Sequence, residues 1–360
     1  MRIRGIYLLL LVLLALSYRT TAQEAPDPSH KKAESKNEIK SAAVPEKENW
    51  GVLDDLKTGL VPRTVDEIQR DEQPGFVRQL LRVEWRLTDP IDLWVLRPKV
   101  SGKVPVVLYL YDYPDAGEHF RDNGWAKRAT ADGFAAVGFV SALTDYRFRF
   151  RPLSKWFVSE LAESLGTTAH DVQLVVNLMA DRGDMDMDHV GIFGMGSGAS
   201  IAILAAHADP RIKTLDLLDP WGDWPDWLKE SPVVPDEERQ KYLTPEFLKS
   251  LASLDPAAYL PSLKNRGLRL QQTLTEPETP KIAKERIAAG VSSPSQLVKY
   301  ENAQDLLKAW EATGLSGWIK QQMRSQSPHG GNLDSGVATT KTAPNPGGLV
   351  SQGPPTQNAK

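Results

Sequence analysis

Residues 190–199 read VGIFGMGSGA, with glycine at positions 191, 194, 196 and 198. A short apolar strand is predicted at residues 189–193, before the last three of these glycines, and an apolar helix at 199–206, after them. A chain that passes from strand to helix within so few residues needs small side chains, because larger ones would collide with the nearby backbone. The stretch therefore predicts a sharp strand-to-helix turn centred on Gly196.

Strand and helix patterns alternate on both sides of this turn. Residues 104–111 and 134–140 are almost continuously apolar, which is typical of strands buried on both faces. Other strands are predicted at residues 76–87, 92–98, 212–218, 268–272 and 296–300, and helices at 125–131, 157–180 and 303–323. This order predicts an α/β fold, a mostly parallel sheet with helices on both faces, in which ligands bind at the carboxyl ends of the strands.

The turn resembles the nucleophile elbow of the α/β-hydrolase superfamily, of the dienelactone hydrolase and prolyl oligopeptidase-like esterase type. In that superfamily a strand ends in G-x-S-x-G and turns into a helix, with the nucleophilic serine at the centre. Here Gly194 and Gly198 are the outer glycines, Met195 and Ser197 lie inside them, and the central position is Gly196. The resemblance extends over residues 76–323 and implies the α/β-hydrolase fold.

Three positions depart from the superfamily's catalytic pattern. Gly196 has no hydroxyl group. The loop after the third strand, which usually carries a His-Gly pair beside the oxyanion hole, reads DYPDAG at residues 112–117. Residues 300–305, YENAQD, contain no histidine where the catalytic base should follow the last strand. Because a catalytic triad works as a unit, with losses of about 10⁶-fold for the serine or histidine alone in one protease, these departures indicate a pseudoenzyme.

Ser197 is the nearest candidate for a replacement nucleophile. If the turn moved by one residue, its hydroxyl would face the pocket, with Met195 and Ala199 at the outer positions. Methionine fits poorly there, so the pattern favours Ser197 as an early residue of the helix.

Candidates for the remaining members of a triad are less well defined. Glu276, in TEPETP after a predicted strand, is either the catalytic acid or a loop carboxylate before a helix, and Asp219 is a second candidate acid. His119, in the loop after the third strand, is the one histidine expected near the pocket. The others are His30 and His329 in the terminal segments, His170 and His207 on helices, and His189, which begins a strand at the far edge of the sheet from the elbow.

Candidate ligand-binding residues lie in the loops around the elbow. Asp112 and Tyr113 follow the third strand, and Trp221, Trp224 and Trp227 follow the strand at 212–218. The indoles either stack on a sugar or aromatic ligand or close the core beneath a cap at residues 221–262. The alternating aromatic and basic residues 146–151 either hold an anion or form a half-solvated strand.

Composition excludes several classes of site. The chain has 360 residues and no cysteine, which excludes disulfides, thiolate metal sites and a cysteine nucleophile. The aspartates at 184, 186 and 188 lack the glycine and glutamate that a calcium loop requires, so we expect neither a metal nor a cofactor. The formal charge of −3 gives no indication of nucleic-acid binding.

The two ends of the chain differ in composition from its centre. Residues 1–23 combine early arginines with a short apolar run and small residues, which predicts a signal peptide and export to the periplasm or the extracellular space. Residues 24–49 read as a disordered linker, 50–324 as the α/β-hydrolase-fold domain and 325–360 as a disordered tail. We expect no transmembrane span once the signal is removed.

Three hypotheses about function follow from these patterns. The first is an exported, catalytically inactive protein that binds a small molecule or a protein partner through the pocket of the fold. The second is an active serine hydrolase of carboxylic esters or peptides that uses Ser197 and a non-standard base. The third is a cell-envelope interaction module whose terminal segments act as tethers.

Overall fold

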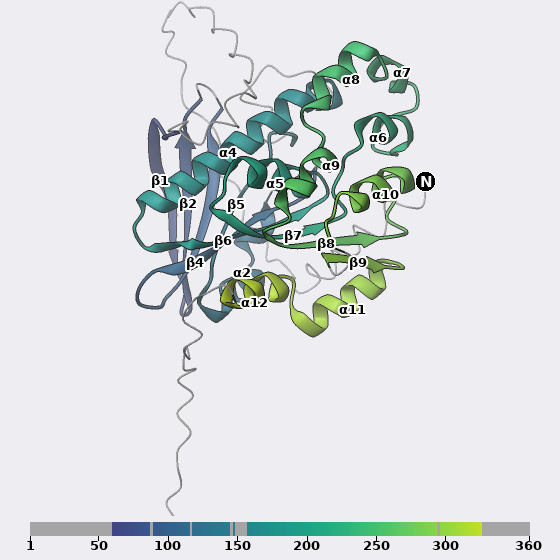
Figure 1. Cartoon of the computed structure of the whole chain (residues 1–360). Helices are drawn as coiled ribbons and strands as arrows, with labels where there is room; N and C mark the ends of the chain where they lie inside the picture. Colours follow the sequence, from purple (N-terminus) through teal and green to yellow (C-terminus); the bar gives the residue numbers. More distant parts are fainter. Residues whose placement is uncertain are drawn as a thin grey trace, which may run out of the picture. The chain divides into compact units, whose positions relative to one another are not determined.

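The structure is a computed structural model. It describes residues 60–325 except 87–88, 116, 145–146, 148–156 and 294–295. The described residues form a nine-stranded sheet in the order β1-β2-β3-β5-β4-β6-β7-β8-β9 (Figure 1). The predicted signal peptide, linker and tail, the first ten residues of the predicted domain, His30 and His329 all lie outside the described residues, apart from Ser325 at the end of the last helix.

The strands are β1 (Thr64–Glu72), β2 (Phe76–Glu84), β3 (Ile91–Pro98), β4 (Val104–Leu110), β5 (Ala135–Phe139), β6 (Met185–Met195), β7 (Ile212–Leu218), β8 (Gly267–Thr273) and β9 (Leu297–Tyr300). The α-helices are α2 (Asn123–Ala129), α4 (Leu161–Asp181), α5 (Gly196–Ala208), α6 (Trp224–Glu230), α7 (Arg239–Tyr242), α8 (Pro245–Ala252), α9 (Pro256–Tyr259), α10 (Lys281–Ala289), α11 (Ala303–Thr313) and α12 (Gly317–Ser325). Short 3₁₀ helices are η2 (Glu118–Arg121), η3 (Ala131–Gly133), η4 (Phe157–Glu160) and η5 (Leu260–Leu263).

Pairing within the sheet brings the carboxyl ends of four strands together. The pairs from β4 to β9, and β4 with β5, are parallel, whereas β1 with β2, β2 with β3 and β3 with β5 are antiparallel. Leu110 at the end of β4 pairs with Gly194 in β6, and Leu218 at the end of β7 pairs with Gln271 in β8. The loops that follow these strands therefore lie at one edge of the sheet, around the start of α5.

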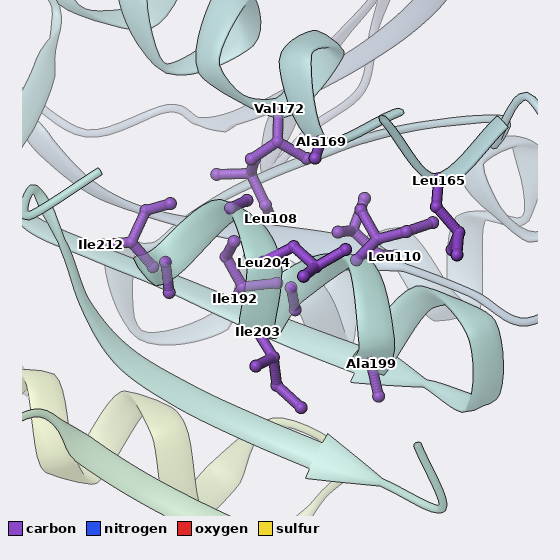
Figure 2. Close-up of a cluster of buried hydrophobic side chains, with 14 of the residues drawn as sticks. Leu108, Leu110, Leu165, Ala169, Val172, Ile192, Ala199, Ile203, Leu204 and Ile212 are labelled. Carbon is purple, nitrogen blue, oxygen red and sulfur yellow. The ribbon is translucent and has the colours of Figure 1, made fainter. Parts of the chain in front are cut away.

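Two apolar layers hold the helices against the sheet. On one face, α4 and α5 pack over the central strands, and their side chains interlock with those of β4 and β6, as Leu108, Ile192, Ile203 and Val172 show in Figure 2. Helix α5 is apolar on all sides, and nearly all of it is buried. On the other face, η2, α2, α11 and α12 cover the strands through residues that include Phe120, Trp125, Ile319 and Met323.

The structure differs from the predicted elements in several places, each with a physical reason. Strand β1 was not predicted, because its sequence TVDEIQRDE is polar and almost every residue is exposed, so it has no apolar alternation. The elbow strand begins at Met185 rather than at residue 189. The helix predicted at 303–323 is two helices, which Gly314 separates with a φ of 79°.

Arg147 has a structural role instead of the predicted anion-binding one. Its guanidinium nitrogens lie 2.8 Å from Asp89 Oδ2 and 2.6 Å from Asp171 Oδ2, and all three side chains are buried. The prediction of an anion site is therefore wrong for Arg147, because two carboxylates of the protein already satisfy its charge. The other residues of the predicted segment 146–151 lie outside the described residues.

Candidate functional site

The turn between β6 and α5 has the geometry of a sharp elbow. Met195 is extended, with φ −123° and ψ 140°, and Gly196 follows it with a φ of 48°. This left-handed conformation costs other L-residues about 1–2 kcal/mol, so glycine is the least strained residue at the apex. The prediction of a strand-to-helix turn centred on Gly196 is confirmed, although the helix begins at Gly196 itself and not at residue 199.

The outer glycines allow two backbones to meet at this turn. A Cβ atom at Gly198 would lie 2.2 Å from the carbonyl oxygen of Leu110, and one at Gly194 would lie 2.6 Å from the Cα atom of Ala199. The start of α5 therefore touches the end of β4. This contact brings Asp112, which follows β4 by two residues, over the apex of the elbow.

The carboxyl group of Asp112 fills the place that a side chain at the apex would take. A Cβ atom at Gly196 would lie 2.0 Å from Asp112 Oδ2, far inside van der Waals contact. Asp112 Oδ1 accepts hydrogen bonds from the backbone N–H of Ser197 at 2.7 Å and from its hydroxyl at 2.8 Å. The partners of the predicted ligand-binding residue Asp112 are therefore groups of the protein itself.

Ser197 is committed to this same network. Its Oγ atom accepts the backbone N–H of Tyr113 at 2.9 Å while its proton goes to Asp112, and the residue is fully buried in the first turn of α5. In α/β-hydrolases the oxyanion hole consists of the N–H after the nucleophile and an N–H from the loop after the third strand. In this protein the N–H group of Ser197, which follows the apex, and the N–H group of Tyr113, in the loop after β4, both donate to acceptors within the protein.

Glu278 joins the site from the loop after β8. Its carboxyl group lies near enough to Asp112 and Glu276 to interact with their charges. Burial, together with the charge of nearby Glu276, raises the pKa of Glu278 to about 7. Burial and the charge of Glu278 also raise the pKa of Asp112 well above its ordinary range.

Sequence reasoning missed Glu278, although it lies in the same TEPETP motif as Glu276. The motif offers two glutamates, and their positions do not show which one points to the elbow.

Glu276 is a loop carboxylate before a helix, one of its two predicted roles. Its carboxylate accepts the backbone N–H of Glu278 and that of Thr279, and Oε2 lies 3.1 Å from the Lys284 ammonium group. Lys284 is itself buried and donates to the carbonyl oxygens of Thr273 and Glu276. Glu276 therefore organises the loop that carries Glu278 into α10.

Asp219, at the end of β7, is the fourth acidic residue of this site. It is buried with a φ of 44°, and its Oδ1 atom accepts the backbone N–H of Thr273 at 2.8 Å. Burial, followed by the charge of Glu276, raises the pKa of Asp219 to about 7. The two candidate acids, Glu276 and Asp219, thus lie close together.

His119 does not complete a triad with these groups. Its ring contacts the rings of Tyr111, Phe120 and Trp125, and Nδ1 lies 3.4 Å from Asp115 Oδ2. No hydrogen bond, ion pair or ring contact between described residues joins His119 to the elbow.

The other described histidines lie elsewhere. His170 is on α4, and His207 at the end of α5 contacts Ser262 and Tyr259. His189 lies in β6, the strand that leads to the elbow, with Nδ1 2.7 Å from Asp186 Oδ2; because β6 starts at Met185, His189 is inside the strand and not its first residue.

The three tryptophans after β7 form a buried cluster. Trp221, Trp224 and Trp227 have exposed fractions of 1% or less, and the ring centroids of Trp221 and Trp227 are 4.8 Å apart. Trp224 donates from Nε1 to the carbonyl oxygen of Leu254 at 3.0 Å. Trp224 and Trp227 belong to α6, and all three indoles are part of the buried core, so they offer no exposed face on which a ligand could stack.

Neither sequence comparison found a relative, but the structural comparison did. No protein-family model and no curated protein matches the sequence. Acetyl xylan esterase 1 from Thermoanaerobacterium sp. JW/SL YS485 superposes with a TM-score of 0.55 at 14% identity, over 75% of this chain and 92% of that one. An acetyl xylan esterase from Paenibacillus sp. R4 gives 0.53 at 13% identity, over 75% and 96%. An S-formylglutathione hydrolase from Agrobacterium tumefaciens gives 0.50 at 13% identity, over 71% and 99%.

The chain has the α/β-hydrolase fold. The predicted fold class is confirmed, and the resemblance is one of fold. In this α/β-hydrolase-fold protein the elbow is present, but its apex holds the carboxyl group of another strand's loop in place of a nucleophile. Among the described residues, no group of three or more histidine or acidic side chains is arranged to hold a metal ion.

Replacing Gly196 by alanine should destabilise the protein for two separable reasons. The left-handed backbone should cost about 1–2 kcal/mol, and the collision with Asp112 should add roughly 1–3 kcal/mol. Gly183→Ala is the matched control, because Gly183 has a φ of 73° and open space around its Cβ position. Urea unfolding should show a larger loss for Gly196→Ala, which Asp112→Gly partly restores. Equal losses for the two glycine variants would refute the contact with Asp112.

Asp219 should make stability depend on pH. Its pKa of about 7 in the folded state lies above the value of about 4 for an unfolded aspartate. The folded state therefore holds this proton more tightly, and the resulting stabilisation is full below pH 4 and is lost as the pH rises through 7.

Asp219→Asn keeps an oxygen for the N–H of Thr273 and removes the titration. We expect its unfolding free energy to match that of the wild type at pH 4 or below and to exceed it at pH 8 by roughly 4 kcal/mol, which is about 1.4 kcal/mol for each pKa unit of the shift. Asp188→Asn, at a highly exposed aspartate, is the control and should show no such difference between the two pH values. A variant no more stable than the wild type at pH 8 would contradict the assignment.

Proposed function

We propose that this protein is a non-hydrolytic member of its fold that binds a small molecule or a protein partner at the loops around the elbow. The observation that carries the proposal is the position of Asp112, whose carboxyl group lies where a nucleophile's side chain would begin. The same group accepts the N–H of Ser197, which an active hydrolase offers to the developing oxyanion.

Three further observations support the loss of hydrolysis. Gly196 has no side chain, the hydroxyl of Ser197 is buried between Asp112 and Tyr113, and no described histidine contacts either of them. Removing a serine or histidine from a triad costs about 10⁶-fold in a protease where both were tested. In enzymes that lose a triad residue, the oxyanion hole still accelerates hydrolysis to some extent. That remaining acceleration is not available where the protein's own carboxyl group occupies the N–H of Ser197.

Binding is supported by the location of the loops. Parallel sheets of this kind hold ligands at the carboxyl ends of their strands, which is where Asp112, Asp219 and Glu278 gather. The structural neighbours are acetyl xylan esterases and an S-formylglutathione hydrolase, at identities that carry the fold alone. We therefore use esters of the kinds named for these neighbours only as compounds to test.

Purified protein should neither hydrolyse p-nitrophenyl acetate or acetylated xylan above the background rate nor react with a fluorophosphonate probe. We expect this because the hydroxyl of Ser197 already donates a hydrogen bond to Asp112 and accepts one from the N–H of Tyr113. Binding is measured separately, as a rise in melting temperature with added substrate that no turnover accompanies.

Two variants give this experiment a sharp outcome. Ser197→Ala removes the candidate nucleophile, and Ser200→Ala removes a buried hydroxyl from the same helix. Probe labelling that persists in Ser200→Ala and vanishes in Ser197→Ala would establish the alternative, an active serine hydrolase.

We also propose that the protein is exported and that residues 1–23 are removed on the way. The arginines at positions 2 and 4, the apolar run at 6–16 and the polar residues after it support this proposal. Among the described residues, none of the helices is both long and apolar enough to cross a bilayer.

The export proposal is tested by expressing the full chain in a bacterial host and sequencing the N-terminus of the protein recovered outside the cytoplasm. We expect the mature chain to begin at residue 23 or 24, and a variant with two arginines inserted into the apolar run to stay inside the cell. Full-length protein in the membrane fraction would show an uncleaved anchor instead.

A further inference from the structure

We propose that two arginines and two aspartates form a positioning network, a set of paired charges that fixes the connection after β5 at the edge of the sheet where the elbow lies. Its members are Arg86, Asp89, Arg147 and Asp171. The role of the network rests on the binding function proposed above, because this edge is where a ligand would bind. Its effect on the connection can be tested without a ligand.

The four side chains of the positioning network balance one another in charge. Arg147 donates from Nη2 to Asp89 Oδ2 at 2.8 Å and from Nη1 to Asp171 Oδ2 at 2.6 Å. Nitrogens of Arg86 lie 3.2 Å from Asp89 Oδ2 and 3.5 Å from Asp171 Oδ1. Each carboxylate therefore faces both guanidinium groups. Arg147 and the two aspartates are buried, whereas Arg86 is partly exposed.

The network joins three segments of the chain. Arg86 and Asp89 lie in the connection between β2 and β3, Asp171 lies on α4, and Arg147 follows β5. Arg86 also donates to the carbonyl oxygen of Thr167 on α4 at 2.9 Å. Because β5 is parallel to β4 and antiparallel to β3, the connection after β5 and the one before β3 leave the sheet at the edge that carries the elbow. The network thus holds two connections of this edge against one helix.

The network also reaches the loop that carries Asp112. Nη1 of Arg147 donates to the carbonyl oxygen of Val140, the residue after β5, at 3.4 Å. A Cβ atom at Gly117, at the end of the Asp112 loop, would lie 3.5 Å from Cγ2 of Val140, which is ordinary van der Waals contact. Val140 therefore lies between Arg147 and the neighbouring loop, and its backbone is held by the buried guanidinium group.

A separate hydrogen bond shows how closely the same connection follows α4. The backbone N–H of Ala142 donates to Thr168 Oγ1 at 3.0 Å. Thr168 lies on α4, about one turn before Asp171. The amide of Ala142 is therefore a reporter for the position of the connection against the helix.

Buried ion networks have different effects on stability and on conformation. Removing one member leaves an uncompensated charge in the core and is strongly destabilising, whereas removing opposite charges together is often nearly neutral. If the network fixes the connection, removing one arginine and one aspartate together should spare most of the stability and still release the connection after β5.

Arg147→Met and Asp171→Asn, singly and together, separate these two effects in the full-length protein. The asparagine keeps an oxygen for the indole N–H of Trp85, which donates to Asp171 at 2.9 Å. Arg147→Met alone should raise the unfolding equilibrium constant by about a hundredfold or more in urea titrations, because two buried carboxylates lose a shared cation. The double variant should recover at least about tenfold of that loss.

Amide exchange of Ala142 is the deciding measurement, and Ile192, a buried residue of β6, reports global unfolding. In the double variant, exchange at Ala142 should accelerate at least about tenfold more than exchange at Ile192, as expected for the loss of one net hydrogen bond. Equal accelerations at the two amides would overturn the proposal. A double variant no more stable than Arg147→Met would do the same.

The chain offers a matched control at the opposite edge of the sheet. Asp209 and Arg211 lie between the end of α5 and the start of β7, with Arg211 Nη2 2.6 Å from Asp209 Oδ2. Asp209→Asn with Arg211→Met should leave the ratio of exchange rates at Ala142 and Ile192 unchanged. These measurements need no ligand, so failure of the network and failure of the proposed binding function give different results.

Discussion

The carboxyl group of Asp112 lies in the space that the first side-chain atom of residue 196 would fill, and much of the site's chemistry follows from that contact. A Cβ atom there would lie 2.0 Å from the carboxyl oxygen, so a side chain at the apex and the aspartate in this position exclude each other. The left-handed backbone of Gly196 and the two donors of Ser197 then hold the arrangement on both sides.

Neighbouring hydrogen-bond donors, and not distant counterions, offset the desolvation free energy of the buried acidic groups. A carboxyl group without partners loses several kcal/mol on leaving water. Asp112 has two donors from Ser197, Asp219 has the N–H of Thr273, and Glu276 has two backbone donors and Lys284. Burial and the charge of Glu276 raise the pKa of Glu278, which favours its neutral form in the folded protein.

The fold could be predicted from sequence because its central elements carry strong, local signals. The strand at 212–218 and the elbow glycines were found from apolar runs and from residue type alone. The exposed strand β1 was missed because its pairing with β2 depends on neighbours and not on an apolar pattern of its own.

The site was predictable in its members but not in its contacts. Asp112, Ser197, Asp219 and Glu276 were all named as candidates, yet sequence spacing does not show that Asp112 turns back onto Ser197. Sequence spacing likewise did not identify Glu278, two residues from Glu276, as a member of the site. It also could not show whether the tryptophans bind a ligand or belong to the core, because that depends on the burial of Trp221 and Trp224.

The elbow itself is explained by packing and does not require catalysis. Helix α5 is apolar on all sides and fills the core between α4 and the sheet, so its start must come close to β4 whatever its chemistry. Gly198 permits the approach to Leu110, and Gly194 permits the helix to turn back beside its own strand. A glycine-rich turn in this position is therefore evidence for the fold. Evidence for hydrolysis would have to come from the group at its apex, and here that group is a carboxyl from the loop after β4, which accepts hydrogen bonds from the backbone N–H and the hydroxyl of Ser197.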